Sequence, residues 1–368
     1  MTFELIKPGI NINFIGRRHI AFAISGLLIL ICLGSIAFKG LQMGIDFAGG
    51  LLVQARFSQS VDPDQIREAL AKADLPAPSI QGFGEAGDNE YLINLQADES
   101  DMESDVATET SLSQKVSDSL TAHFGAGQVE IRRVEMVGPK VGADLRQKAM
   151  SALYYSILMI LIYISGRFEH KWGTSAVLVG ALLAAVYLAS LIGISMIYLI
   201  ILAVVVTVIL CYALKFEYAL GAILALLHDV IVTVGVFSLL DKEITLSFVA
   251  AILTIAGYSL NDTIIIYDRI REHVSKTRKG DYATTINRSI NETLSRTVLT
   301  SGSTLLVILA LYLLGGPVNQ DFALALLIGI GVGTLSSIFI SAPALLFWTK
   351  PTGTEDSAPG APKAAQTA

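Results

Sequence analysis

Three ionisable residues lie in or beside long apolar segments of the chain. Asp229 lies at the middle of one segment, Asp262 lies within the next, and Arg296 precedes a third. A charge at the centre of a membrane helix costs at least about 2.5–3.5 kcal/mol, so each of these residues needs a specific reason to be there. Carboxylates, an arginine and hydroxyls at helical spacing predict a proton relay between packed helices.

Smaller polar residues accompany these groups. Asn261 and Thr263 flank Asp262, and Thr297 follows Arg296, so we treat them as supporting residues of the relay. Two alternatives stay open. The aspartates can be neutral or paired purely for helix packing, and Arg296 can extend to the membrane surface as a topological anchor.

His228 directly precedes Asp229. Neighbouring residues of a helix point about 100° apart, so we expect that the two side chains do not share a face. His228 is therefore interpreted as a packed histidine and not as a member of the relay.

Other chemistry is scarce in the sequence. It has no Walker lysine motif, no His/Cys metal cluster and no G-x-S-x-G motif, so we predict no metal and no cofactor other than protons. Cys32 and Cys211 lie in apolar runs and are expected to be small buried hydrophobes. Gly44–Gly50 is interpreted as a tight exit from the membrane and not as a phosphate-binding loop.

The composition explains where these groups must lie. Hydrophobic residues make up 53% of the 368 residues and charged residues only 16%, against about 25% in soluble proteins. Residues 174–214 carry no charge at all, whereas residues 40–140 hold 17 Asp and Glu against 7 Lys and Arg, a net charge of −10. A purely soluble enzyme is excluded, and the bilayer is the predicted surroundings of most of the chain.

The apolar segments are long enough to span a bilayer as helices, which takes roughly 20 residues. The first could be a signal peptide, but its length and the lack of an A-x-A exit favour an uncleaved helix. We predict eight spans: Ile20–Phe38, Ala149–Ser165, Ser175–Ile192, Met196–Leu214, Ala219–Leu240, Leu246–Tyr267, Val298–Leu314 and Phe322–Trp348.

Lys and Arg gather in one set of connections, which predicts that both termini and the basic loop 268–296 are cytoplasmic. The predicted regions are a first helix within 1–38, a periplasmic domain at 39–145, a membrane bundle at 146–348 and a disordered cytoplasmic tail at 349–368. The basic residues fit membrane topology, so we predict no binding of nucleic acid.

The periplasmic segment has the pattern of a small α+β unit. Its expected elements follow the order βαββαβ of a ferredoxin-like fold, with the acidic stretch 98–110 as a solvated loop. The elements are strand Gly50–Phe57, helix Gln65–Ala73 capped by Asp62 and Pro63, strands Ile80–Phe83 and Tyr91–Leu95, helix Leu112–Phe124 and strand Val129–Val137.

The chain also contains an internal repeat. Arg167-Phe168-Glu169 recurs 48 residues later as Lys215-Phe216-Glu217, and apolar spans flank each copy. This indicates a duplicated helix pair at 166–214, although short aromatic-acid caps can also recur by chance.

Several motifs together resemble the SecF members of the SecD/SecF family, relatives of the RND transporters. They are GIDFAGG at 44–50, VGPKVGADLRQKA at 137–149, ALGAILALLHD at 219–229, AAILTIAGYSLNDTIIIYDRIRE at 250–272 and TLSRTVLTSG at 293–302. The resemblance implies six spans in an RND-like bundle and one outer domain. The departure from six is the extra pair, in which Ala181 stands where the second copy has Asp229, so that pair is expected to be peripheral.

The resemblance implies that the chain, with SecD, couples the proton motive force to late steps of preprotein translocation across the inner membrane. Asp262 and Arg296 match the family's proton pathway, and Asp229 is a weaker match. The implied partners are SecD, the SecY/SecE/SecG channel, YajC, YidC and the unfolded preprotein. The alternatives are an RND-type transporter of a small substrate and a purely structural subunit of a membrane complex.

Overall fold

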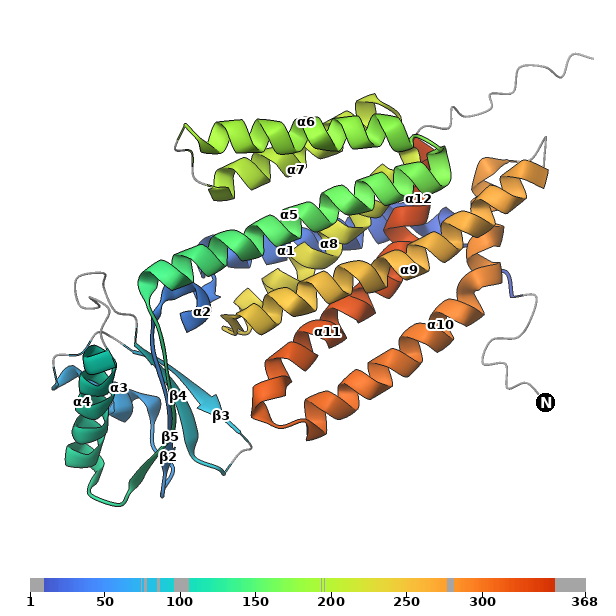
Figure 1. Ribbon diagram of the computed structural model, residues 1–368. Coiled ribbons are helices and arrows are strands. Elements are labelled where there is room, and N and C mark those ends of the chain that lie inside the picture. Colours follow the sequence, from blue (N-terminus) through green and yellow to red (C-terminus); the bar gives the residue numbers. More distant parts are fainter. Residues whose placement is uncertain are drawn as a thin grey trace, which may run out of the picture.

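The computed structural model describes residues 10–73, 75, 78–84, 87–95, 106–192, 194, 196–276 and 281–347. The predicted tail 349–368 and residues 98–105 of the predicted acidic loop lie outside these residues. Long helices form a bundle that carries a small α+β domain at one end, which we call the domain end (Figure 1). The opposite end is called the far end.

Eight long helices make up the described part of the bundle. Seven helices are long and apolar enough to cross a membrane, and α7 contributes the shorter apolar helix Tyr198–Ala213. The chain is therefore a multi-pass membrane protein, as predicted. The helices are α1 Arg18–Phe38, α5 Pro139–Glu169, α6 Trp172–Ser190, α7 Met196–Ala213, α8 Glu217–Leu239, α9 Leu246–Lys276, α10 Tyr282–Leu314 and α11 Pro317–Ser336.

Short elements precede α1 and follow α11. A 3-10 turn, η1 Ile15–Arg17, precedes α1, and α11 continues into η2 Ser337–Ser341, α12 Ala342–Ala344 and η3 Leu345–Phe347. The connection predicted as a basic loop is helical for most of its length, because α9 extends to Lys276 and α10 begins at Tyr282.

The α+β domain has the predicted ferredoxin-like arrangement. Its sheet has the order β3-β4-β2-β5, and all neighbouring strands are antiparallel. Asp62 caps the first helix through a capping box with Gln65, and Pro63 takes the first helical position. The elements are β2 Gly50–Phe57, α3 Pro63–Ala71, β3 Ser79–Phe83, β4 Glu90–Leu95, α4 Val106–Phe124 and β5 Val129–Val137.

The domain core forms because β2 alternates. Leu51, Val53, Ala55 and Phe57 are buried on the face of the sheet that packs against α3 and α4. The remaining buried apolar side chains of this core are Val61, Ile66, Ala69, Leu70, Ile93, Leu95, Val116 and Leu120.

The domain joins the bundle through a second, two-stranded sheet. The strand β1 Gln42–Met43 pairs in parallel with β6 Glu243–Ile244, and α2 Ile45–Ala48 follows β1. Gly49 then turns the chain with a φ of 73°, and a Cβ on it would lie 2.7 Å from Pro139 Cα. Only glycine fits this close approach, which agrees with the tight exit predicted for Gly44–Gly50.

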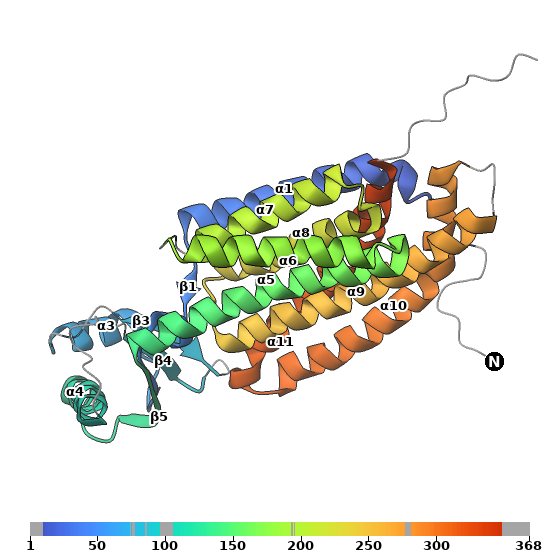
Figure 2. The same ribbon diagram turned by 45° about the horizontal axis from the view of Figure 1, so that its top comes forward.

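The extra pair α6–α7 lies at the side of the bundle, against α5 (Figures 1 and 2). Only 17% of the residues in the apolar window of α6 are buried, against 67% in α8. Lys171 ties the pair together, since its Nζ donates to the carbonyls of Leu214 at 3.3 Å and Lys215 at 2.9 Å. The pair is therefore peripheral, as expected.

Candidate functional site

Asp229 lies at the middle of α8 and is fully buried. Its Oδ2 accepts hydrogen bonds from Ser259 Oγ on α9 at 2.8 Å and from Ser336 Oγ on α11 at 2.9 Å. His228 Nδ1 lies 3.1 Å from Oδ1. Three helices thus converge on this carboxyl group, and both of its oxygens have partners.

His228 and Asp229 are in contact although neighbouring residues of a helix do not share a face. Their Cβ atoms point about 100° apart around the helix, but an imidazole and a carboxyl group each extend far enough to bend towards one another. The 3.1 Å contact lies inside the bundle, where His228 is 6% exposed. His228 is thus packed inside the bundle, as expected, and its ring contacts the Asp229 carboxyl group.

The close approach of α11 to Asp229 depends on Gly333. A Cβ on this residue would lie 3.2 Å from Asp229 Oδ2 and 3.1 Å from Ser259 Cβ. The absence of a side chain there lets Ser336, one turn further along α11, reach the carboxyl group.

Immediately after Ser336 the backbone changes to a π-helix, Ser337–Ser341. Single π-helical turns inside α-helices occur frequently at functional sites. In this turn Ser341 Oγ lies 2.6 Å from the Tyr267 hydroxyl of α9. Sequence reasoning missed Ser336, and the only signal for it was a group of Gly and Ser residues in the last apolar segment.

Asp262 lies on α9, one helical turn after Ser259, and is 1% exposed. Its Oδ2 accepts a hydrogen bond from Ser301 Oγ of α10 at 3.0 Å. Its Oδ1 is buried and has no hydrogen-bond partner among the described residues, and the same holds for Thr297 Oγ1, one turn before Ser301 on α10. Leaving buried polar atoms unpaired is costly, so this site favours the uptake of a proton or a water molecule.

The other predicted residues lie around Asp262 in different ways. Thr263 is buried beside it, whereas Asn261 and Arg296 are exposed on the surface of the helices. Arg296 is near enough for its charge to act on Asp262. Within the described part of the chain the two groups form no ion pair within 4.0 Å.

A chain of polar groups therefore crosses the bundle from α8 to α10. Ser259 and Asp262 are three residues apart on one face of α9, which places their Cβ atoms about 5–6 Å apart. Two carboxyl groups, each bonded to serine hydroxyls and about one helical turn apart, can take up and release protons at successive positions. Among the described residues, no group of three or more His, Cys, Asp or Glu side chains is arranged to hold a metal.

The helix that carries Asp262 is attached to the α+β domain. Its first residue, Leu246, donates its backbone N–H to Asp46 Oδ2 at 2.8 Å, and Asp46 belongs to α2 at the base of the domain. Leu246 and Asp262 are 16 residues apart, or about 24 Å along the helix. One rigid helix thus connects the base of the domain with the buried carboxyl group.

A carboxyl group outside the membrane-spanning helices also joins the two parts. Glu243 of β6 accepts hydrogen bonds at Oε1 from Gln81 Nε2 at 3.3 Å and from Asn94 Nδ2 at 3.5 Å, both in the α+β domain. Burial raises the pKa of Glu243, the bond from Asn94 counteracts this rise, and the carboxylates of Asp321 and Asp46 add to it.

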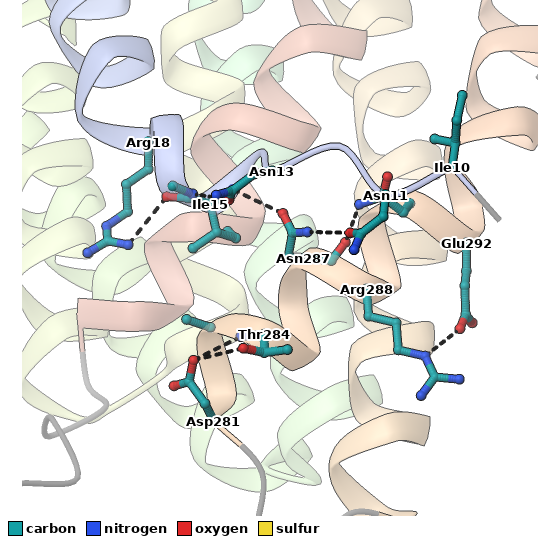
Figure 3. A pocket seen from close by; sticks show the side chains of 13 residues that line it. Ile10, Asn11, Asn13, Ile15, Arg18, Asp281, Thr284, Asn287, Arg288 and Glu292 are labelled. Carbon is teal, nitrogen blue, oxygen red and sulfur yellow. Dashed lines mark hydrogen bonds and ion pairs between the residues drawn. The ribbon is translucent and has the colours of Figure 1, made fainter. Parts of the chain in front are cut away.

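A polar cavity of about 730 Å³ lies at the far end, between the N-terminal segment and α10 (Figure 3). Asn287 Oδ1 accepts the backbone N–H of Phe14 at 2.8 Å and so ties this segment to α10. Its described lining contains Arg18, Arg288, Asp281 and Glu292, and Arg288 forms an ion pair with Glu292 at 2.8 Å.

The chain matches two protein-family models. The model for the C-terminal part of the protein export membrane proteins SecD and SecF matches residues 116–197 and 188–351. The SecD/SecF GG motif matches residues 34–61, which include Gly49 and the base of the α+β domain.

Proteins named as SecF subunits are similar to this chain over nearly their whole length. The protein translocase subunit SecF of Magnetococcus marinus is 42% identical over 343 residues, which cover 93% of this chain and 94% of the relative. The protein translocase subunit SecF of Escherichia coli O157:H7 is 35% identical over 346 residues, covering 94% and 90% of the two chains.

Solved structures of SecDF match the fold. SecDF from Thermus thermophilus, a translocon-associated membrane protein, superposes with a TM-score of 0.65 at 32% identity. A SecDF structure in the super-membrane-facing form gives a TM-score of 0.58. The first match covers 92% of this chain but only 39% of the SecDF chain. The fold, the motif at the base of the domain and these relatives agree, and the chain belongs to the SecD/SecF family as a subunit of the Sec protein translocase.

Proposed function

We propose that the chain works with a SecD partner to couple the proton motive force to late steps of preprotein translocation. The observation that carries this proposal is the environment of Asp262, a buried carboxyl group with one unpartnered oxygen. It lies on a helix whose first residue is bonded to the base of the α+β domain. A change in the protonation of Asp262 can therefore act on the domain through α9.

The energy available is sufficient for such coupling. One charge that crosses about 100 mV releases roughly 2.3 kcal/mol. A difference of this size changes the ratio of two conformations about fiftyfold, provided that proton binding favours one of them. In this proposal protons are the only energy source, and no bound cofactor takes part.

The proposal places the protein in the inner membrane with both termini cytoplasmic and residues 39–145 in the periplasm. The domain end is then periplasmic, where it meets the unfolded preprotein, and the far end is cytoplasmic. Lys and Arg on the far-end connections support this orientation.

The proposed partners are SecD, the SecY/SecE/SecG channel, YajC and YidC. The match to 39% of a SecDF chain supports SecD as the missing part of the transporter. Asn261 and Arg296 support it as well, since polar side chains exposed on membrane helices favour cover by another protein over contact with lipid.

The test is Asp262→Asn, which keeps the size of the side chain but cannot release a proton. The variant is co-purified with SecD and compared with the parent in export of a reporter preprotein and in proton uptake by proteoliposomes. We expect loss of both activities with an intact complex. The matched control is Asp268→Asn, further along the same helix in an exposed ion pair with Arg167, and it should retain both activities.

Two other results would replace the proposal. Normal export by Asp262→Asn in an intact complex would favour a purely structural subunit. Vesicle uptake of small molecules, with no export defect in a deletion strain, would favour an RND-type transporter.

A further inference from the structure

A cavity beside α1 reaches His228, the neighbour of Asp229. This cavity, here called the α1 pocket, has a volume of about 340 Å³. Its walls are mostly apolar side chains of α1, α11 and η2. The lining residues are Arg17, Ile20, Ala21, Ile24, Ser25, Leu28, His228, Val332, Leu335, Ser336, Phe339 and Ile340.

The pocket extends from one end of the bundle to its middle. Arg17 lies just before α1 and Leu28 lies eleven residues further, so the lining spans roughly 16 Å along the helix. This length is close to half of the roughly 30 Å hydrocarbon core of a bilayer. His228 belongs to the middle of α8, and Arg17 lies at the far end of the bundle, just before α1.

His228 connects this pocket with Asp229. Its Nδ1 lies 3.1 Å from Asp229 Oδ1, whereas its Nε2 is buried and no residue in the described part of the chain bonds to it. The ring is 6% exposed, so the unpartnered nitrogen is an uncompensated polar atom. Asp229 on its own helix and Arg17 at the far end are the charged groups around the ring and the described pocket lining, with hydroxyls from Ser25 and Ser336.

We propose that His228 carries protons between Asp229 and the α1 pocket, and that this pocket is a second opening of the polar chain, on a different side of the bundle from Asp262 and Arg296. The proposal rests on the proton coupling proposed above. A neutral imidazole with its proton on Nε2 accepts the proton of the Asp229 carboxyl group at Nδ1, which leaves a carboxylate and an imidazolium. Nε2 then releases its proton to a water molecule in the pocket, giving hydronium and the Nδ1-protonated ring. Transfer of the remaining ring proton from Nδ1 to Nε2 through water, followed by uptake of a proton by the Asp229 carboxylate from the bundle side, restores the starting arrangement.

The Asp229 site lies close to Asp262 inside the bundle. Ser259 bonds to the same carboxyl group and lies one turn from Asp262 on α9. The histidine thus stands at one end of the polar chain and Arg296 lies near its other end. The two ends reach different sides of the bundle, α1 and α10.

The test uses two substitutions of His228 in the complex with SecD, measured as proton uptake by proteoliposomes with a pH-sensitive dye. His228→Asn keeps a donor near the position of Nδ1 but has no group that carries a proton. His228→Ala leaves space beside the pocket for added imidazole. We expect both variants to lose at least about tenfold in proton flux. Imidazole should restore flux in His228→Ala and not in His228→Asn.

The matched control is His19→Asn, an exposed histidine of α1 outside the pocket lining, which should leave the flux unchanged. Normal flux in His228→Asn would show that the histidine only positions Asp229, and it would overturn the proposal. Lack of rescue of a folded His228→Ala by imidazole would also overturn it. If His228→Ala does not fold, His228→Asn decides alone.

The same experiment separates this inference from the proposed function. If Asp262→Asn abolishes flux while His228→Asn does not, only the relay is wrong. If neither substitution changes the flux, the proton coupling itself is wrong.

Discussion

Asp229 and Asp262 are two buried carboxyl groups on neighbouring helices, and their surroundings differ. Asp229 has three side-chain partners from α8, α9 and α11, and both of its oxygens are bonded. Asp262 has one partner, Ser301, and its other oxygen is buried without any. Burial is nearly complete in both cases.

This difference separates a packed site from an open one. A fully bonded carboxyl group holds three helices together, and a change in its protonation disturbs several hydrogen bonds at once. A half-bonded carboxyl group can gain a proton or a water molecule without breaking any bond. Asp262 is therefore suited to switch between states, and Asp229 is suited to pass a proton through a fixed framework.

The largest expected effect on stability comes from adding a methyl group beside the tightly packed Asp229 site. In Gly333→Ala the added Cβ would lie 3.2 Å from Asp229 Oδ2, and such overpacking typically costs about 1–3 kcal/mol. We expect the melting temperature of the purified protein to fall by about 2–4 °C for each kcal/mol. Gly331→Ala is the control, because its Cβ would meet nothing within 4 Å. An equal fall in both variants would show that the Asp229 site is no tighter than its surroundings.

The next comparison removes one serine from each site. Ser301→Ala takes away the one side-chain hydrogen bond to Asp262 in the described structure, so we expect reporter export to fall about tenfold, the effect of about 1.4 kcal/mol. Ser259→Ala leaves Asp229 with Ser336 and His228, and export should fall no more than about twofold. Export rates in a depletion strain measure both. A larger loss in Ser259→Ala would reverse the roles given to the two sites.

A third carboxyl group, Glu243, extends the comparison to the junction with the α+β domain. Its pKa is raised by burial, so Glu243 holds its proton more strongly when the α+β domain is packed on the bundle than when the protein is unfolded. Stability from this group is therefore greatest below the ordinary pKa of 4.5 and is lost as the pH rises towards the raised pKa.

Glu243→Gln imitates the protonated form at every pH. We expect its melting temperature to equal that of the parent near pH 4.5 and to exceed it by about 2 °C at pH 8. Thermal unfolding at both pH values measures the difference. A gap of the same size at both would exclude titration of Glu243 as its cause.

The smallest effect on export is expected from deletion of the repeat copy in which Ala181 stands at the position of Asp229. Removing residues 170–217 joins Glu169 to Tyr218 and deletes the peripheral pair α6–α7. The backbone N–H of Tyr218 already lies 2.9 Å from Glu169 Oε1, so the new junction requires little movement. Export should stay within about twofold of the parent, the level expected for a surface change. A loss as large as that of Ser301→Ala would show that the pair takes part in the mechanism.

Much of the fold could be predicted because its signals are local. Alternation in β2, the Asp62–Pro63 helix start and the long apolar segments each depend on neighbouring residues, and all were found in the structure. The pairing of β1 with β6 was missed, since two-residue strands about 200 residues apart leave no periodic pattern. The contact between Asp46 and the first residue of α9 was missed for the same reason.

The candidate site divides in the same way. The placement of a few ionisable groups in apolar helices could be predicted, because their cost in a bilayer depends only on residue type and position along the helix. The partners of these groups depend on how the helices pack and could not be predicted. Ser301 is 39 residues from Asp262 and Ser336 is 107 residues from Asp229, and helix packing alone brings them together. Packing likewise turned His228 from a neighbour in the chain into a bonded partner of Asp229, because it enclosed both side chains away from water.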